Sequence, residues 1–366
     1  MKKFRNVGAG ILVAVWAFLT VFAWVKPAGD FTDAERRPLA QFPELSLENL
    51  SSGKFITEFE DYTLDQFPGR DLFRRLKALA HYNLFGQKDN NDIYIADGYA
   101  AKLDYPVRTA DVAHALQRLN YVYETYLEPA GSKVYSTVIP DKGYYLAEKN
   151  GYPAMDYEKM FQTFREGLPF ARYVDITDCL SHTDYYFTDT HWRQEKLLPV
   201  AQKLSAALGV TAPAQADFQQ VKQAVPFYGV YYGQAALNME PEAIFVLESE
   251  LLKACQVYDF ETGNYTPVYN LEKLSGKDPY DVFLSGAKSL LRMENPNAKT
   301  DRELLIFRDS FGSSLAPLLV QDYKTVTLVD IRYMDSRLLG NFLEFTGQDV
   351  LFAYSTSVLN SGTTLK

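Results

Sequence analysis

The sequence Ile306-Phe307-Arg308-Asp309-Ser310-Phe311-Gly312-Ser313-Ser314 joins a short apolar run to a segment with helical character. The apolar run, residues 304–307, has the length of a buried parallel strand, and residues 315–319 after the serines predict a helix. In α/β enzymes such a unit presents a nucleophile, because the sharp turn lifts one side chain above the carboxyl edge of the sheet. We therefore predict that Ser310 is a nucleophile, and that Ser313 and Ser314 belong to the first turn of the helix.

A serine hydroxyl is inert unless a base takes its proton, and the string Asp189-Thr190-His191-Trp192 contains a candidate. Residues two apart in an extended segment project to the same side, so Asp189 can hold one nitrogen of His191 while the other faces Ser310. The three residues would then form a Ser-His-Asp triad. The alternative interpretation is a loop aspartate that caps the following helix beside a half-buried histidine.

Two neighbouring residues compete for roles in this triad. His182, in Ser181-His182-Thr183-Asp184, is the rival base. Asp309 is a poor rival acid, because its side chain points away from that of the adjacent serine. We expect Asp309 to hold the turn in place.

Substrate-binding residues are expected around the same motifs. An oxyanion hole needs N–H donors aimed at the developing charge. The Ser310 amide is the first candidate, and the Gly229 amide the second, since glycine lets a backbone approach a ligand closely. Aromatic residues near the motifs, among them Tyr186 and Trp192, predict a platform for sugar rings, with packing in the core as the alternative. Arg308, in the turn itself, is also assigned to substrate binding.

Composition excludes several classes of function. The chain has 366 residues, 47% of them hydrophobic and 23% charged, which is typical of a globular protein. Its net charge of −9 argues against nucleic-acid binding, which requires a basic face. The four histidines and two cysteines show no ligand spacing, so we expect no metal site. Cys179 and Cys255 are either one disulfide or two free thiols.

The N-terminus contains an uncharged run from Val7 to Val25, preceded by Lys2, Lys3 and Arg5. The run is long enough to cross a bilayer core of ~30 Å as a helix. The basic flank would hold the N-terminus in the cytoplasm and place the remainder outside. A cleaved signal peptide is the alternative, but the run is long for one and lacks a clear cleavage site. We favour an uncleaved single-pass anchor in the cell membrane.

The rest of the chain divides into two regions by its periodicity. We divide the sequence into a cytoplasmic tip and anchor (1–28), a helical membrane-proximal region (29–92) and an α/β domain (93–366). Helical patterns fill the second region, and its basic cluster at Arg70, Arg74, Arg75 and Lys77 is expected to be a solvated face. Strands and helices alternate from Ile93 onward, which favours a mostly parallel sheet covered on both faces. Residues 226–285 are interpreted as an insertion of antiparallel strands.

Several strings together make the chain similar to the DHHW family of bacterial envelope proteins. More distantly, it resembles the alginate O-acetyltransferases with an SGNH-hydrolase-like fold. The strings, which lie in all parts of the chain after the anchor, are Phe31-Thr32-Asp33-Ala34-Glu35-Arg36-Arg37-Pro38-Leu39, Ile139-Pro140-Asp141-Lys142, Thr188-Asp189-Thr190-His191-Trp192, Phe227-Tyr228-Gly229, Arg308-Asp309-Ser310-Phe311-Gly312 and Val329-Asp330-Ile331-Arg332.

The resemblance implies a three-layer α/β/α fold, permuted relative to ordinary SGNH hydrolases, with an N-terminal transmembrane helix and a helical collar. It implies Ser310 as the acyl-accepting nucleophile, His191 as its base and Asp189 as the residue that orients His191. Thr190 replaces the first histidine of the family's name but matches the DTHW string of the alginate enzymes. Arg308 replaces the glycine of their GDSF turn.

The expected activity is O-acetyl transfer to, or O-deacetylation of, a cell-surface polysaccharide through an acyl-Ser310 intermediate, without a cofactor. For transfer, the resemblance implies a polytopic membrane acyltransferase that delivers the acetyl group. The competing hypothesis is a non-catalytic envelope protein that binds polysaccharide or scaffolds an assembly on the same fold.

Overall fold

The computed structural model describes residues 2–32 and 34–366. Met1 lies outside the described residues, as does Asp33 of the string at 31–39; the side chains of residues 2–6, which include the basic flank, and of Leu12 are also outside them. The chain forms two compact units. One comprises Met1–Asn91 with Tyr232–Asn238, and the other comprises Asp92–Tyr231 with Met239–Lys366. The second, called the α/β unit below, contains the candidate site.

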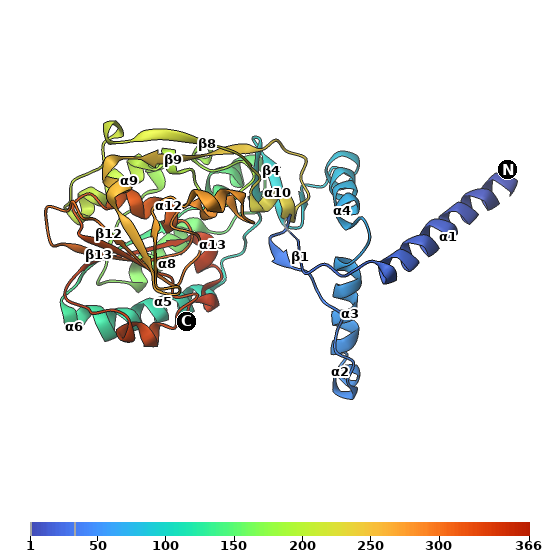
Figure 1. The fold of residues 1–366 in the computed structure, drawn as a ribbon, viewed down its shortest axis with the longest axis horizontal. Helices are drawn as coiled ribbons and strands as arrows, with labels where there is room; N and C mark the ends of the chain where they lie inside the picture. The colour runs from blue at the N-terminus through green and yellow to red at the C-terminus, as the bar shows by residue number, and fades with distance from the viewer. Residues whose placement is uncertain (1, 33) are drawn as a thin grey trace. The chain divides into compact units, whose positions relative to one another are not determined.

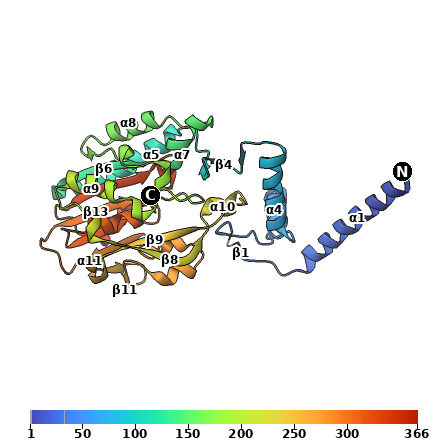
Figure 2. The same ribbon diagram turned by 90° about the horizontal axis from the view of Figure 1, so that it is seen from above.

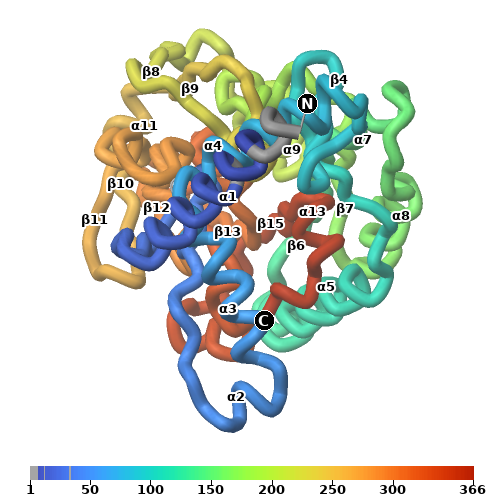
Figure 3. The backbone as a smooth tube through the Cα atoms, turned by 90° about the vertical axis from the view of Figure 1, so that its right-hand side faces the viewer, coloured from blue at the N-terminus to red at the C-terminus, as the bar shows by residue number. Residues whose placement is uncertain are grey.

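An eight-stranded sheet forms the centre of the α/β unit, and Figure 3 shows its strands crossing the molecule from β11 to β7. Five strands, from β14 to β7, are parallel to one another, whereas β12, β10 and β11 extend the sheet antiparallel. In sheet order the strands are β11 (Asn264–Pro267), β10 (Gln256–Asp259), β12 (Leu290–Glu294), β14 (Thr325–Val329), β13 (Glu303–Arg308), β15 (Asp349–Ser355), β6 (Lys133–Ile139) and β7 (Arg172–Tyr173).

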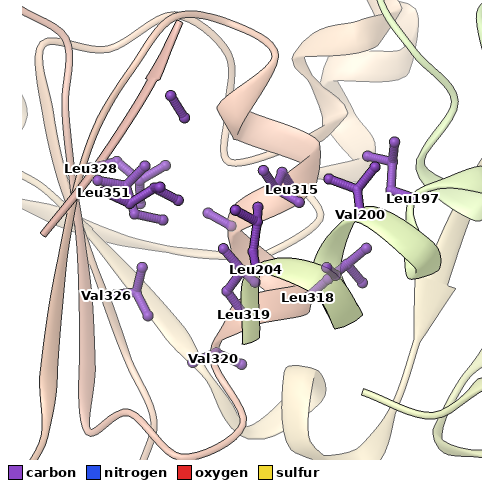
Figure 4. Packing of buried hydrophobic residues seen from close by; sticks show 14 of the residues in the cluster. Leu197, Val200, Leu204, Leu315, Leu318, Leu319, Val320, Val326, Leu328 and Leu351 are labelled. Carbon is purple, nitrogen blue, oxygen red and sulfur yellow. The ribbon is translucent and has the colours of Figure 1, made fainter. Parts of the chain in front are cut away.

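In the central strands β13, β14 and β15 both faces of the sheet are buried, since nearly all residues of these strands are buried and successive side chains point to opposite sides. In β13, Leu304 and Ile306 join one hydrophobic cluster, whereas Leu305 and Phe307 join another. The first cluster includes residues of α9 (Leu198–Leu208) and η10 (Ala316–Leu319). In Figure 4, Leu204 and Leu319 lie on the side of these helices toward Val326, Leu328 and Leu351 of the sheet. The second cluster includes α5 (Thr109–Val122) and α8 (Tyr157–Gly167), which lie next to each other in Figure 2.

Helices therefore cover both faces of the sheet, with α9 on one side and α5 on the other in Figure 1. This arrangement confirms a mixed α/β fold around one large sheet. The other elements of the unit are short: β4 (Ile93–Ala96), β5 (Tyr99–Lys102), η2 (Tyr123–Leu127), α6 (Glu128–Ala130), α7 (Lys142–Leu146), η3 (Glu148–Asn150), η4 (Thr177–Cys179), η5 (His182–Asp184), η6 (Gln194–Lys196), η7 (Gln215–Asp217), α11 (Glu250–Ala254), η8 (Leu271–Ser275), η9 (Pro279–Val282), α12 (Gly312–Leu315), η11 (Ser336–Asn341), α13 (Thr356–Leu359) and η12 (Gly362–Thr364).

The range expected as an insertion, 226–285, contributes strands to two different sheets. Its first part contributes to a separate antiparallel pair of β8 (Gln219–Phe227) with β9 (Glu242–Glu248). Its second part contains β10 and β11, and β10 is hydrogen-bonded to β12 of the main sheet. The short helix α10 (Val230–Gln234) connects to β9. The domain boundaries and the insertion stay predictions.

The first unit consists mainly of helices. They are α1 (Lys2–Val25), α2 (Leu47–Ser51), α3 (Lys54–Asp65), α4 (Arg70–Leu79) and η1 (Ala80–Leu84), with short strands β1 (Phe31–Thr32), β2 (Arg37–Pro38) and β3 (Asp89–Asn90). In α1, the segment Val7–Val25 has a mean hydropathy of 2.1, with none of it buried, so it is long and apolar enough to cross a membrane. A signal sequence would meet the same criterion.

The basic cluster of α4 is partly misjudged from sequence. Arg70 and Arg74 are not solvated, because they form ion pairs with Glu35 at 2.6 and 2.9 Å and keep only 17% and 16% of their side chains exposed. Arg75 and Lys77 are exposed, as expected. The arginines and Glu35 lie in different parts of the sequence, so helical periodicity alone could not pair them.

Candidate active site

The turn after β13 is held by Asp309. Its buried carboxylate accepts hydrogen bonds from the Phe311 amide at 3.0 Å and from the Ser355 amide, at the end of β15, at 2.7 Å. These bonds fix the turn to the neighbouring strand and leave Ser310 partly exposed at the carboxyl edge of the sheet. The expectation that Asp309 stabilises the turn is confirmed. Ser313 and Ser314 lie in α12, buried, as expected for first-turn residues.

Folding brings Ser310, His191 and Asp189 together. The Oγ atom of Ser310 lies 2.7 Å from Nε2 of His191, across 119 positions of sequence. The Nδ1 atom of His191 lies 2.6 Å from Oδ1 of Asp189. His182 does not take this place; it lies in η5, where its ring meets Tyr99 edge-on at 5.1 Å. The geometry expected of a triad is therefore present with His191, whereas the catalytic roles stay predictions.

The local conformation around Asp189 differs from the expected one. Asp189 and His191 lie in a tight loop that is closed by a bridge between Tyr185 and Trp192, not in an extended segment. Asp189 Oδ1 also accepts the backbone N–H of His191 at 3.0 Å, and Oδ2 accepts that of Val230 at 2.8 Å. The loop, rather than strand alternation, therefore sets both side chains on the same side, and the buried carboxylate is held on both oxygens.

Gly229 approaches this loop instead of a ligand. Its amide donates to Oγ1 of Thr188 at 2.9 Å, so it is not directed at Ser310 and the second candidate for the oxyanion hole is wrong. A Cβ atom at this position would come within 2.3 Å of the Thr188 carbonyl oxygen and 2.4 Å of Asp189 Cα. A glycine is needed here because two backbone segments pass in close contact.

The aromatic residues expected to bind sugar rings are in the core. Trp192 is fully buried, and its Nε1 donates to the Phe311 carbonyl at 3.1 Å and to Oγ of Ser314 at 2.9 Å. It thereby joins the histidine loop to the nucleophile turn. Tyr186 is also fully buried and packs edge-on against Phe227. Neither ring offers a face to a sugar in this structure, which favours the alternative of core packing.

Arg308 also lies inside the protein rather than in an open binding site. It is 0% exposed, and its Nη1 donates to the Asp309 carbonyl at 3.3 Å. Burial lowers the pKa of its guanidinium, a shift that the nearby Asp330 carboxylate opposes. The side-chain stem packs under Gly312, where an added Cβ would lie 2.7 Å from Arg308 Cβ. The assignment of Arg308 to substrate binding requires an accessible side chain, and its burial contradicts this.

Tyr280 contacts the candidate base but was not identified from sequence. Its ring stacks on the His191 imidazole with centroids 3.9 Å apart and planes at 7°. Its hydroxyl lies 2.8 Å from Oγ of Ser314. The stack restricts rotation of the imidazole, and the nearby turn-rich sequence contains no signal that could have revealed the contact.

A buried lysine, Lys142, also holds the histidine loop in place. Lys142, only 2% exposed, donates through Nζ to the carbonyls of Tyr186 at 2.8 Å and Phe187 at 3.3 Å, directly before Thr188. Burial lowers the pKa of its ammonium to about 7, although the charge of Asp189 opposes the shift. The string at 139–142 contained this lysine, but its spacing gave no indication of a role near His191.

Glu242 is the second ionisable group behind the loop. Its Oε2 accepts the Thr188 amide at 3.1 Å. Burial raises the pKa of its carboxyl to about 7, while the Lys142 ammonium lowers it by a smaller amount. Lys142 and Glu242 thus both hold backbone groups of the segment that leads to Asp189.

The state of the two cysteines and the presence of a metal-binding cluster can be read from the described residues. Cys179 and Cys255 are free thiols, so the disulfide alternative is not formed. In residues 2–32 and 34–366, no group of three or more His, Cys, Asp or Glu side chains is placed to hold a metal ion.

Fold and site together define the class of protein: an α/β sheet that presents a Ser-His-Asp set at the carboxyl ends of its parallel strands. The model of the family described as "DHHW protein" matches residues 173–329, the segment that contains Asp189, His191 and Ser310. The resemblance to the DHHW family is therefore confirmed. No curated protein matches the sequence.

Solved structures share the fold at low sequence identity. A DHHW family protein from Eubacterium siraeum DSM 15702 is 22% identical, with a TM-score of 0.63 over 75% of this chain and 94% of that one. Bacillus cereus PatB1 with sulfonyl adduct is 18% identical, with a TM-score of 0.60 over 73% and 95%. The O-acetyltransferase domain of Pseudomonas putida AlgJ is 15% identical, with a TM-score of 0.44 over 73% and 92%. The first two similarities establish the fold alone.

Proposed function

We propose that this protein transfers or hydrolyses O-acyl groups through an acyl-Ser310 intermediate. The observation that carries the proposal is the relay in which His191 contacts Ser310 Oγ through Nε2 and Asp189 through Nδ1. A purely structural histidine has no need of a serine hydroxyl on one nitrogen and a buried carboxylate on the other. Chance packing seldom produces both contacts on one ring at the carboxyl edge of a sheet.

In the proposed reaction, each proton transfer uses a named atom of this relay. His191 Nε2 accepts the hydroxyl proton while Ser310 Oγ attacks the acyl carbonyl, and Asp189 stabilises the imidazolium through Nδ1–H. The Ser310 amide is the expected donor to the tetrahedral oxyanion. His191 returns the proton to the departing alcohol as the C–O bond to it breaks, which leaves an ester on Ser310. An acceptor hydroxyl or water then gives its proton to Nε2 and attacks that ester, and Nε2 passes the proton to Ser310 Oγ as the bond between Oγ and the acyl carbon breaks.

For the substrate, we propose O-acetyl groups on a cell-surface polysaccharide. This step rests on the sequence resemblance to the DHHW family and the alginate O-acetyltransferases, and on the shared fold. A permuted SGNH-like topology follows from the same resemblance. PatB1 with its sulfonyl adduct suggests a probe for this chain, since sulfonyl fluorides modify activated serine hydroxyls.

The cellular arrangement is a further part of the proposal. We propose that Val7–Val25 anchors the protein in the cell membrane and that the α/β unit lies outside the cytoplasm. For transfer, a polytopic membrane acyltransferase would supply the acetyl group. Protease added outside intact cells should digest the α/β unit and spare a short N-terminal tag. Full protection of the α/β unit would contradict this orientation.

A scaffold that binds polysaccharide without turnover is the second candidate, favoured by the burial of Tyr186, Trp192 and Arg308, which leaves the predicted substrate contacts unaccounted for. The two functions are separated by incubating the full chain with an activated acetyl ester, with and without an O-deacetylated polysaccharide. Acetyl appearing on the polysaccharide indicates transfer, and acetate release alone indicates esterase activity. Polysaccharide binding without either product would favour the scaffold.

A further inference from the structure

The helix α4, the following η1 and the residue directly after η1 carry exposed apolar side chains, which we name the apolar stripe. Large apolar groups in water are unfavourable, and a contiguous set of them marks a surface that contacts something. The members of the stripe, with their exposed fractions, are Leu72 (61%), Phe73 (47%), Leu76 (52%), Leu79 (44%), Leu84 (75%) and Phe85 (66%).

The polar side of α4 fixes which way the stripe faces. Arg70 and Arg74 turn toward Glu35, and Arg74 Nη2 also donates to the carbonyls of Gly233 at 2.8 Å and Gln234 at 2.9 Å. These contacts hold one face of the helix against its own unit. The opposite face, which bears the stripe, stays largely exposed, and within that unit the Phe73 ring meets the Phe67 ring edge-on at 5.4 Å.

The chain holds the start of α4 close to the end of α1. Gly29 follows Val25, the last residue of α1, by four positions (29 − 25). Its backbone N–H and carbonyl both bond to the side chain of Gln66, at 2.8 and 2.9 Å, and α4 begins at Arg70. Four residues span at most about 14 Å. Gln66, which lies four positions before the start of α4, is therefore bonded to a residue within about 14 Å of Val25, the end of the apolar helix.

We propose that the apolar stripe lies in the surface of the lipid bilayer that α1 enters. The tether keeps the stripe at the depth where an amphipathic helix inserts its apolar side ~5–10 Å into the boundary between headgroups and acyl chains. Arg75, Lys77 and Lys88 are exposed in the same segment and fit anionic headgroups. The exposed Asp71 lies within 4.0 Å of Arg70 and Arg74, which partly compensate its charge.

This contact goes beyond the proposed acyl chemistry, because it assigns a second attachment to the membrane. A single spanning helix leaves the rest of the chain free to rotate and tilt. A helix lying in the surface would restrict the first unit to one orientation relative to the bilayer. The inference shares with the proposed localisation the requirement that α1 enters a membrane, but it does not depend on the reaction.

Spin labels on the full chain in vesicles test the proposal. Leu76→Cys places a nitroxide on the stripe, and Leu271→Cys places one on a matched exposed leucine (52%) of the α/β unit. Cys179 and Cys255 are replaced by alanine in both variants. Vesicles are made of phosphatidylcholine, alone or with phosphatidylglycerol, and accessibility to oxygen and to a water-soluble nickel complex is measured at each label.

The label at 76 should show a ratio of oxygen to nickel accessibility several-fold higher than the label at 271, and the difference should increase with phosphatidylglycerol. Equal ratios at the two positions would overturn the proposal. Low accessibility of the label at 76 to both reagents would also overturn it, because this result indicates a protein contact such as a second copy. Failure of the full chain to float with the vesicles would also overturn the proposal, because the stripe would then have no bilayer to lie in. Acyl transfer is not part of the readout, so the proposed function can fail or hold independently.

Discussion

The loop of Asp189 and His191 and the helix α4 are built on opposite principles. In the loop, the buried carboxylate and imidazole of Asp189 and His191 have partners inside the α/β unit. On α4, charged arginines are held inside the first unit while large apolar side chains are exposed. The side chains of the loop already have their partners without a bound ligand. The exposed apolar side chains of α4 would be buried only by contact with a further surface. Changes in the loop should therefore affect chemistry, and changes on α4 should affect attachment.

The largest effect is expected when the relay itself is interrupted. His191→Ala removes the base, and Asp189→Asn removes the charge that stabilises the imidazolium. His191→Ala should lower acyl-transfer or esterase kcat by roughly 10⁶-fold, and Asp189→Asn should lower it by roughly 10⁴-fold. His182→Ala is the matched control and should retain nearly full activity. If His182→Ala proves as damaging as His191→Ala, the assignment of the base is wrong.

Gly229→Ala should have the next largest effect, because it forces apart two backbone segments behind Asp189. The added methyl would lie 2.3 Å from the Thr188 carbonyl oxygen. We expect a loss of about 2–4 kcal/mol in the free energy of unfolding and a reduced kcat. Gly340→Ala is the control, since its new Cβ meets only a ring carbon of Tyr126 at 3.2 Å. Denaturant titration of both variants checks the prediction, and equal stability of the two would contradict it.

Lys142→Met should have a moderate effect on activity. It removes the donor to the Tyr186 carbonyl and the cation behind Asp189 while keeping an unbranched side chain. We expect kcat to decrease by roughly 10–100-fold, within the range given by displaced catalytic groups. The KM for an acetyl ester should change little, because Lys142 does not line an open site. A large rise in KM at unchanged kcat would show that Lys142 acts on substrate binding instead.

Glu242 should give stability a pH dependence that Glu242→Gln lacks. The folded-state pKa of Glu242 is raised to about 7 from an ordinary 4.5, so folding takes up a proton between these values. Its stabilising contribution is complete below pH 4.5 and is lost as the pH rises through 7. The free energy of unfolding of the wild type, relative to Glu242→Gln, should fall by about 1–3 kcal/mol from pH 4.5 to 7.5. A constant difference across this range would contradict the raised pKa.

Changes in the first unit should have no effect on catalysis, since Asp189 and His191 have hydrogen-bond partners inside the α/β unit. Glu35→Gln weakens the ion pairs with Arg70 and Arg74 and should destabilise α4 locally by about 1–2 kcal/mol. Hydrogen exchange of the α4 amides should accelerate, while acetyl-ester turnover stays at the wild-type rate. Loss of turnover would mean that the two regions are not independent.

Features that depend on neighbouring residues could be predicted from the sequence, whereas contacts between distant segments could not. The strand and turn around Ser310 were predictable, because the signals lie within a few residues of one another. The choice of His191 over His182 was possible only through combination with that turn, since 119 positions separate the partners. Tyr280, Glu242 and the packing role of Gly229 were missed because each acts on a segment distant in sequence.

Charged residues were the least predictable group. Arg308 and Lys142 are fully or almost fully buried, whereas charged side chains are ordinarily exposed. Arg74 was expected on a solvated face and instead binds Glu35. Lys142 and Arg74 have their partners in other elements, and Arg308 donates to the adjacent Asp309 carbonyl and lies near Asp330, so local composition did not indicate their burial. Such exceptions occur where a fold uses a charge to hold a backbone segment in position.

The most direct test of the account is a covalent acetyl group on Ser310. The full chain is mixed with an activated acetyl ester, quenched within the first turnover and digested for mass spectrometry. We predict one acetyl group per chain on the peptide that contains Ser310, formed in a burst by the wild type and absent from Ser310→Ala. An arylsulfonyl fluoride should block the same residue. An equal burst in Ser310→Ala, or an adduct on any other residue, would contradict the assignment of Ser310 as the nucleophile.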